Sequence, residues 1–427
     1  MLDRSVAPAL SSVEIIKLIK PVSFTLDNGI PIHFIVNGKQ PVVRLEIILS
    51  AGTWFETIPN SSFFFTKLLS SGTKTQNSSQ IEEKLAYYGA FLELNPGSDR
   101  INITVYCLQK FLVEILALLD DILSNSVFPE AEFQSQKNIN IQQLKVNQEK
   151  TSFLAGNEFK KALFGSEHPY GRCLTIENIE RLNQTNLIEY YRSKLMTSCE
   201  AHIIISGGDI DIDYALKEIN DKFSHLRNQA VQITEHLPCP SENKRIHIEK
   251  PNSLQSSIRV GLPLFTFSHP DYFNINILID VLGGYFGSRL MKNIREEKGF
   301  TYGINASFPV MAKAGYMVIG TDVKTENTEE TIEEIYKEID TLKKDLIPSS
   351  ELNVLKNYLL GSFANSIGTA FSHADKFKTI YLNELEESFY QNYLNKVKSI
   401  TSKELLETAN KYFINNKFYT VMVGASE

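Results

Sequence analysis

One internal repeat constrains this chain most, because the same succession of strands and helices occurs twice in the same order. A strand predicted at 44–49 corresponds to one at 257–262, and a helix that begins near Phe128 corresponds to one that begins near Ile347. The offset between partners is roughly 213 to 219 residues, which is too long for a solenoid repeat and suits two duplicated domains. The other corresponding segments are the strands that open at 88–91 and 302–305, and the helix-and-strand pairs 186–195 with 203–207 and 404–413 with 420–424.

The repeat also predicts the fold class and the domain limits. Each half mixes strands with long amphipathic helices and lacks regular β-α-β alternation, so we predict an α+β fold with a mainly antiparallel sheet in each half. Residues 226–246 are polar and contain two prolines, which is typical of a linker. We therefore expect an N-terminal domain at 1–225 and a C-terminal domain at 247–427. A chance likeness between two α+β segments is the alternative at this point.

Composition excludes several classes of protein. The 427 residues are 43% hydrophobic, enough for at least two cores, and this excludes an intrinsically disordered chain. The 43 Lys and Arg against 50 Asp and Glu give a net charge of -7. A domain that neutralises phosphates needs a basic surplus, so nucleic acid is not expected as a partner.

Three features bear on the compartment. The most apolar run, 111–123, contains three acidic residues and is shorter than the about 20 residues that a membrane span needs. The first residues, 1–5, lead into a stretch without the apolar core of a signal peptide. No C-x-x-C pair occurs, which favours a reducing compartment. We expect no membrane association and a cytoplasmic location; the four cysteines are Cys107, Cys173, Cys199 and Cys239.

A short apolar helix is predicted at 61–69, between N-cap candidates and the turn 71–73. This helix, the turn and the duplicated layout resemble the pitrilysin/insulinase metallopeptidases, the inverzincins with an H-x-x-E-H motif. The resemblance covers nearly the whole chain, including 167–172 and 288–302, and implies half of a processing-peptidase-like clamshell. In that family, two His of the motif bind Zn²⁺ and its Glu is the general base, while a Glu about 76 residues later is the third ligand.

The zinc motif itself is degenerate in this chain. Aligned on the Gly-Thr turn, the two histidine positions hold Phe63 and Lys67, and the base position holds Thr66. Gln143 stands at the position of the third ligand. Phe has no lone pair, Lys would oppose the metal electrostatically, and Gln is uncharged. The resemblance thus implies that this chain binds no metal and is inactive alone.

No substitute site is evident elsewhere in the sequence. None of the eight histidines lies four residues from another, so no helix can present two histidines on one face at this spacing. A nucleophile elbow, a P-loop and a dinucleotide fingerprint are absent as well.

The segment 283–302 resembles the family's C-terminal signature. We expect a helix capped by Ser288 and ended by Gly299, followed by a strand that alternates from Tyr302. In the family, an Arg seven residues before a Tyr faces the zinc across the cavity, and this pair matches Arg295 and Tyr302. Their N–H and O–H donors can hold a peptide carbonyl and stabilise an oxyanion. The structural alternative is a helical Arg paired with a carboxylate and a half-buried strand aromatic.

Three glycines, Gly283, Gly284 and Gly287, precede this helix. The resemblance implies that they belong to a glycine-rich segment that contacts substrate. From the residues alone they could equally be a simple helix break.

These implications combine in one hypothesis. The chain resembles the zinc-less subunit of two-chain bacterial enzymes of this family, which pairs with a homologous zinc-bearing subunit in a heterodimer. Arg295 and Tyr302 would bind the scissile carbonyl, and a peptide or small unfolded protein would add as a strand inside the chamber. The alternatives are a catalytically inert structural subunit and a peptide-binding homologue that does not hydrolyse.

Overall fold

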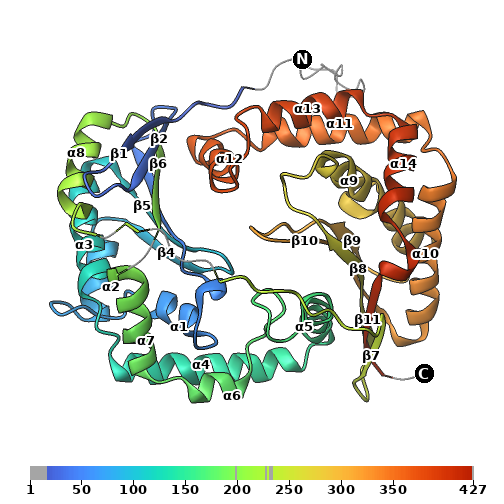
Figure 1. Cartoon of the computed structure of the whole chain (residues 1–427), viewed down its shortest axis with the longest axis horizontal. Coiled ribbons are helices and arrows are strands. Elements are labelled where there is room, and N and C mark those ends of the chain that lie inside the picture. Colours follow the sequence, from blue (N-terminus) through green and yellow to red (C-terminus); the bar gives the residue numbers. More distant parts are fainter. Residues whose placement is uncertain (1–16, 198–199, 227, 230–233, 426–427) are drawn as a thin grey trace, which may run out of the picture.

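The computed structural model describes residues 17–197, 200–226, 228–229 and 234–425. The segment considered for a signal peptide, residues 1–5, and Cys199 lie outside the described residues. Two sheets face each other across the molecule, and helices cover the outer side of each (Figure 1). No helix within the described ranges combines the length and the apolar character that crossing a membrane requires.

The first sheet has six strands in the order β1-β2-β6-β3-β5-β4. Strands β2 and β6 run parallel, and all other neighbours run antiparallel. The predicted mainly antiparallel sheet is therefore confirmed for the first half. The strands are β1 Val22–Thr25, β2 Pro31–Val36, β3 Val42–Leu49, β4 Phe91–Pro96, β5 Ile101–Leu108 and β6 Ala201–Gly207.

The second sheet has five strands in the order β7-β11-β8-β10-β9. It again contains one parallel pair, β7 with β11, among antiparallel neighbours. The order matches β2-β6-β3-β5-β4 strand for strand, so the predicted duplication and the α+β class are confirmed. The strands are β7 Arg245–Glu249, β8 Gln255–Leu264, β9 Ile304–Ser307, β10 Gly315–Lys324 and β11 Tyr419–Gly424.

The outer helices bury the main core of each half. Leu112 and Ile115 of α3 belong to the buried cluster of the first sheet, and Ile332 and Ile335 of α10 to that of the second. The first-half helices are α1 Ser61–Leu68, α2 Ser78–Tyr87, α3 Leu112–Asn125, α4 Glu130–Gln148, α5 Thr151–Phe164, α6 Ile176–Arg181, α7 Gln184–Tyr191, η3 Arg192–Thr197 and α8 Ile212–Phe223. The second-half helices are α9 Tyr272–Ile279, η4 Asp280–Gly284, η5 Met291–Glu297, α10 Thr328–Lys344, α11 Ser349–Asn365, α12 Ala370–Leu382, α13 Phe389–Ser399 and α14 Ser402–Tyr412.

The two halves exchange one helix each on the sides that face each other (Figure 1). Helix α5 of the first half packs on β8 and β11, where Phe159 and Val421 share a buried cluster. Helix α12 of the second half packs on β2 and β6, where Ala374 is buried with Ile35 and Ile204. The two helices are partners in the repeat, so each sheet is completed by the same helix of the other half. The domain limits at 225 and 247 stay a prediction.

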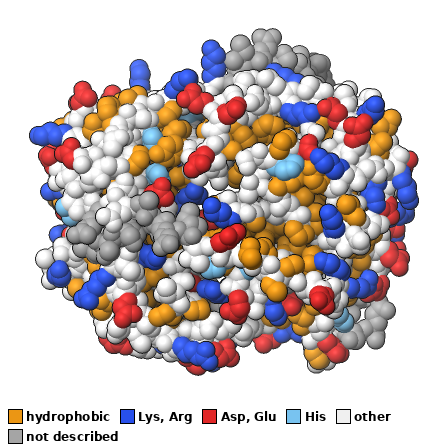
Figure 2. Space-filling view, viewed as in Figure 1, with side chains coloured by type: hydrophobic (Ala, Val, Ile, Leu, Met, Phe, Trp, Pro, Cys, Tyr) orange, Lys and Arg blue, Asp and Glu red, His pale blue; other side chains and the backbone are white. Residues whose placement is uncertain are grey.

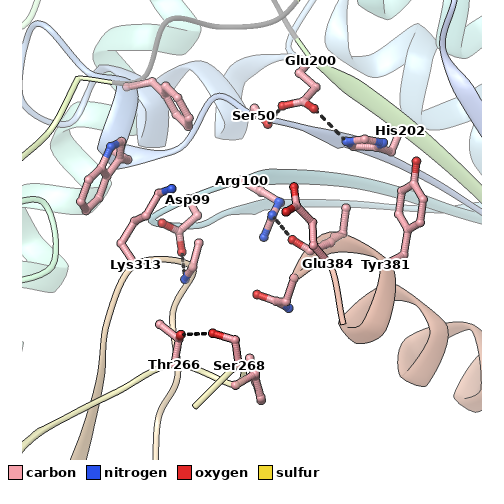
Figure 3. A pocket seen from close by; sticks show the side chains of 16 residues that line it. Ser50, Asp99, Arg100, Glu200, His202, Thr266, Ser268, Lys313, Tyr381 and Glu384 are labelled. Carbon is pink, nitrogen blue, oxygen red and sulfur yellow. Dashed lines mark hydrogen bonds and ion pairs between the residues drawn. The ribbon is translucent and has the colours of Figure 1, made fainter. Parts of the chain in front are cut away.

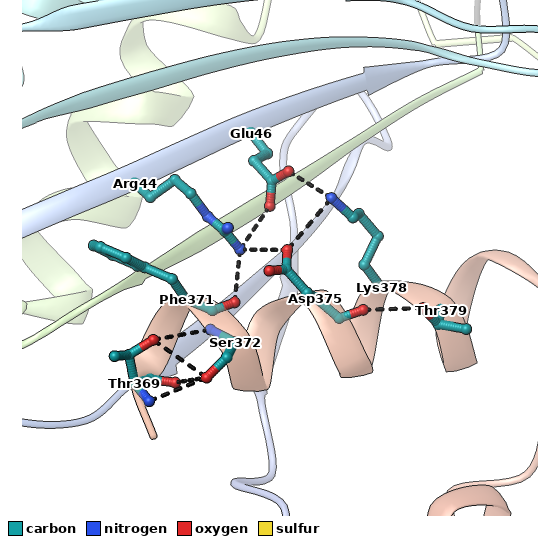
Figure 4. A network of polar contacts seen from close by, with 8 residues as sticks. All are labelled: Arg44, Glu46, Thr369, Phe371, Ser372, Asp375, Lys378 and Thr379. Carbon is teal, nitrogen blue, oxygen red and sulfur yellow. Dashed lines mark hydrogen bonds and ion pairs between the residues drawn. The ribbon is translucent and has the colours of Figure 1, made fainter. Parts of the chain in front are cut away.

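A buried ionic network fastens α12 to β3 (Figure 4). Arg44 Nη2 lies 3.0 Å from Glu46 Oε2 and 2.9 Å from Asp375 Oδ1. Lys378 Nζ lies 2.7 Å from Glu46 Oε1. Arg44 Nη2 also donates to the carbonyl of Phe371 at 2.9 Å. Because the side chains of Arg44 and Glu46 are 7% and 4% exposed, each buried charge depends on its partners across this contact.

The contact between α12 and the first sheet should weaken in acid. His33 is buried against the rings of Phe377 and Tyr381, and burial together with His202 lowers its pKa from 6.5 to about 4. The unfolded chain therefore takes up this proton near pH 6.5, whereas the folded chain resists it until about pH 4. The contribution of His33 to the free energy of unfolding is complete above pH 6.5. It falls by on the order of 3 kcal/mol as the pH drops from there to about 4.

Melting temperatures between pH 7 and pH 4.5 measure this effect. We expect a shallower pH dependence for His33→Gln than for the wild type. His247→Gln, on the exposed side of β7, is the matched control and should keep the wild-type slope. Equal slopes for His33→Gln and wild type would contradict the assignment.

Candidate functional site

Helix α1 carries three of the four positions at which the resemblance implies metal ligands and base. Phe63 is half-buried. Thr66 is fully buried, and its Oγ1 donates to the carbonyl of Ser62 at 2.7 Å. Lys67 is exposed, and its Nζ donates to the carbonyl of Leu94 on β4 at 3.1 Å. These positions hold a hydrocarbon ring, a hydroxyl bonded to backbone and a cation, none of which suits Zn²⁺.

The fourth position, Gln143, is exposed on α4. Helix α4 packs beside α1, with the ring centroids of Phe64 and Phe133 6.1 Å apart. Nowhere in the described part of the chain do three His, Cys, Asp or Glu side chains form a group able to hold a metal ion. The residues present on α1 and α4 therefore do not fit zinc, and no catalytic step can be derived through a metal on this chain.

Arg295 lies on the π-helix η5, in the region where the sequence predicts a helix. Its guanidinium carbon lies 4.7 Å from the ring centroid of Phe286, a cation–π contact. Within the described residues no ion pair of Arg295 with a carboxylate is found, and the choice between a catalytic and a structural role stays a prediction. Gly299 ends the helix with φ of 68°, as predicted, but Ser288 does not cap it, because its hydroxyl is buried without a described partner.

The neighbours of Arg295 anchor η5 to α10. The amide of Asn293 donates to Glu334 and to Glu338, both at 2.8 Å. Lys298 Nζ donates to Glu330 at 2.7 Å. These bonds hold η5 on α10, while Arg295, which is half-buried, takes no part in them.

Tyr302 is 96% exposed and lies in the turn between η5 and β9. Strand β9 begins at Ile304, so the predicted strand start at Tyr302 is wrong, as is the alternative of a half-buried strand aromatic. The turn is nevertheless fixed, because Thr301 Oγ1 donates to the carbonyl of Asp322 at 2.8 Å and accepts from Thr321 Oγ1 at 3.0 Å. A rigid turn thus presents a phenol with no packing role.

Tyr302 borders a shallow cavity of about 490 Å³ on the inner side of the second sheet. Gln255 and Arg259 of β8, Asn305 of β9 and Asp322 of β10 also line it. No hydrogen bond or ring contact among the described interactions joins Arg295 to Tyr302. Arg295 lies within η5 and Tyr302 in the turn that follows it; Tyr302 borders this cavity, whereas Arg295 is partly buried against Phe286 and is not among its lining residues.

The three glycines before η5 have packing roles. A Cβ atom on Gly283 would lie 2.6 Å from the backbone nitrogen of Ala306, so only glycine lets η4 approach β9 this closely. A Cβ atom on Gly284 would lie 2.1 Å from Asp280, whose pKa burial raises from 3.8 to about 7. At Gly287 a Cβ atom would meet the ring of Tyr285. Whether these glycines also contact substrate stays a prediction.

A second cavity of about 460 Å³ lies between the two halves (Figure 3). The first half contributes Arg100, whose Nη2 donates to the carbonyl of Leu382 at 2.6 Å, and Glu200. His202 Nε2 lies 3.7 Å from Glu200, and burial lowers the pKa of His202, which keeps its ring neutral at pH 7. Lys313 enters from the second half. This cavity could not be predicted from the sequence, because its lining comes from short segments far apart in the chain.

Residues 34–169 match the family model of insulinase (peptidase family M16), and residues 183–359 match that of the peptidase M16 inactive domain. The two matches together cover more than half of the chain. The chain belongs to the peptidase M16 (insulinase) family. It is 23% identical to a Bacillus subtilis protein named "Uncharacterized zinc protease YmxG", over 81% of this chain and 84% of that protein. It is 24% identical to a Helicobacter pylori protein named "Non-peptidase homolog YmxG", over 80% of this chain and 79% of that protein.

Solved structures share the M16 fold. A peptidase M16 inactive domain from Pseudomonas fluorescens superposes with a TM-score of 0.86 at 20% identity, over 95% of this chain and 98% of that one. A protease from Helicobacter pylori superposes with a TM-score of 0.84 at 16% identity, over 95% of this chain and 100% of that one. Names of M16 relatives thus include both zinc proteases and a non-peptidase homologue, so the residues at the site must decide the chemistry of each chain.

Proposed function

We propose that this chain is the non-zinc-binding subunit of a heterodimeric metalloendopeptidase. A homologous partner subunit would supply zinc, the attacking water and the general base. Arg295 and Tyr302 would hold the scissile carbonyl from the opposite wall and donate hydrogen bonds to the oxyanion that develops on it.

The exposure of Tyr302 is the observation that carries this proposal. A Tyr that is 96% exposed contributes no burial to the fold, yet the turn that bears it is fixed by the hydrogen bonds of Thr301. The backbone of the turn is thus positioned, while the phenol itself is in solvent and accessible as a hydrogen-bond donor to a ligand. The neighbouring helices η4 and η5 are π-helices, which are rare and frequent at functional sites.

The substrate would bind as an added strand. Among the strands that the structure describes, β4 is at the edge of the first sheet and has β5 as its one neighbour. The carbonyl of Leu94 on this strand accepts from Lys67 at 3.1 Å. An extended peptide could displace this ammonium and pair with β4. Lys67 would then cover the free edge of β4 until a peptide binds.

Mixing this chain with its zinc-bearing homologue from the same source tests the proposal. We expect the mixture to cleave a fluorogenic unstructured peptide at least about tenfold faster than the sum of the separate chains. Metal analysis should find zinc in the complex and none above background in this chain alone. A mixture no faster than the zinc-bearing chain by itself would overturn the proposal.

A catalytically inert homologue is the second candidate, favoured by the name "Non-peptidase homolog" of the Helicobacter pylori relative. In that case the two chains could still associate. The mixture would then form a stable complex by gel filtration, with a rate of cleavage equal to that of the zinc-bearing chain.

A further inference from the structure

An aromatic groove of about 320 Å³ lies between helices α9, α11 and α13, and α12 contributes one residue to its lining. Figure 2 shows that hydrophobic side chains gather around the middle of the molecule on the side of the second half. The rings of Phe273 and Phe389 lie 5.0 Å apart on one wall of the groove, and those of Phe363 and Tyr390 5.5 Å apart on another. Ligand sites begin at about 300 Å³, so the groove has room for one aromatic side chain and a small polar group.

One cation, Lys376, lies among these rings. Its Nζ is 5.3 Å from the ring centroid of Phe363 and 5.2 Å from that of Tyr390. Desolvation by burial lowers the pKa of this ammonium, and Asp375 partly offsets the effect. Asp375, however, is already paired with Arg44 and Lys378. Within the described part of the chain Lys376 has no ion pair of its own, so its charge is available to an anion.

Polar groups complete the groove. Ser362 and Ser366 are exposed on α11 at its edge, and Asn276 of α9 also lines it. A hydroxyl and an amide can donate hydrogen bonds to a carboxylate oxygen or to a peptide carbonyl. Rings, one unpaired cation and neutral donors together select a ligand with an aromatic body and a negative end.

We propose that this groove binds the C-terminal end of a peptide whose last residue is aromatic. The ring would pack against the rings of Phe273 and Phe389, and the terminal carboxylate would pair with Lys376. No lining residue of the groove is shared with the cavity beside Tyr302, so this binding does not depend on the proposed catalytic role.

Calorimetry on the full chain alone tests the proposal with two matched probes, N-acetyl-Ala-Phe and its C-terminal amide. We expect the acid to bind about tenfold more tightly than the amide, because only the acid can pair with Lys376. Decanoate serves as a third probe, which carries a carboxylate without a ring. Failure of the acid to bind, equal binding of acid and amide, or tighter binding of decanoate would each overturn the proposal.

Variants locate the site. Lys376→Met keeps the length of the side chain and should abolish the preference for the acid. Lys403→Met, an 80% exposed lysine on α14, should leave the preference unchanged. Persistence of the preference in a folded Lys376→Met chain would place the carboxylate elsewhere and contradict the assignment. The comparison of acid with amide on the wild type needs no variant and remains decisive if Lys376→Met does not fold.

Discussion

Replacing Tyr302 by Phe should lower the kcat of the proposed two-chain enzyme about 100-fold, since loss of one oxyanion donor typically costs that much. The substitution removes only the O–H group and leaves the ring of a residue that is 96% exposed, so folding should not change. Because the hydrogen bond strengthens as the oxyanion forms, KM should change far less than kcat. Initial rates on a fluorogenic peptide at saturating partner measure both constants.

Matched substitutions separate catalysis from general damage. Tyr87→Phe removes the hydroxyl of another tyrosine, 81% exposed on α2, and should leave kcat unchanged. Arg295→Lys keeps the charge but loses the planar fork, so it should retain more activity than Arg295→Ala. If Tyr302→Phe left kcat within twofold of the wild type, the catalytic role would be wrong even for an active complex.

Glu46→Gln should lower the free energy needed to detach α12 from the first sheet by about 3 kcal/mol. The substitution removes the carboxylate that the buried guanidinium of Arg44 and the ammonium of Lys378 share. That free energy corresponds to about a 100-fold loss of protection for the α12 amides. Hydrogen exchange followed peptide by peptide measures this local opening directly and does not require the whole chain to unfold in one step.

Asp375→Asn is the matched control on the other side of the network. The Asp375 side chain is 50% exposed, so water compensates its loss and the protection of α12 should fall less than tenfold. Equal effects of Glu46→Gln and Asp375→Asn would show that burial does not set the strength of this contact.

Much of the fold could be predicted because its signals are local. Alternating apolar residues such as those of 44–49 and 257–262 have the period of a half-buried strand, and both segments are central strands in the structure. The constant offset between corresponding segments then predicted two equivalent sheets. The absence of ligand types at Phe63 and Lys67 followed from the resemblance, which gives the positions of the zinc motif, together with the chemistry of these two side chains.

The helix exchange could not be predicted from the same signals. The pattern of α5 shows that one face is buried, but it does not say which sheet covers that face. The start of β9 was missed for a related reason, since Tyr302 fits the alternation although its side chain faces solvent. The cavity between the halves and the aromatic groove gather residues from separate segments, and no spacing in the sequence reports such proximity.

The exchange of α5 and α12 also fixes an order of events during synthesis. The inward side of the first sheet, with Ile35, Ile48 and Ile204, stays without its covering helix until α12 has been synthesised, and α12 follows every strand of this sheet in the chain. The N-terminal half thus cannot finish folding on its own as the chain emerges. Until then these apolar residues lack the helix that buries them in the finished fold.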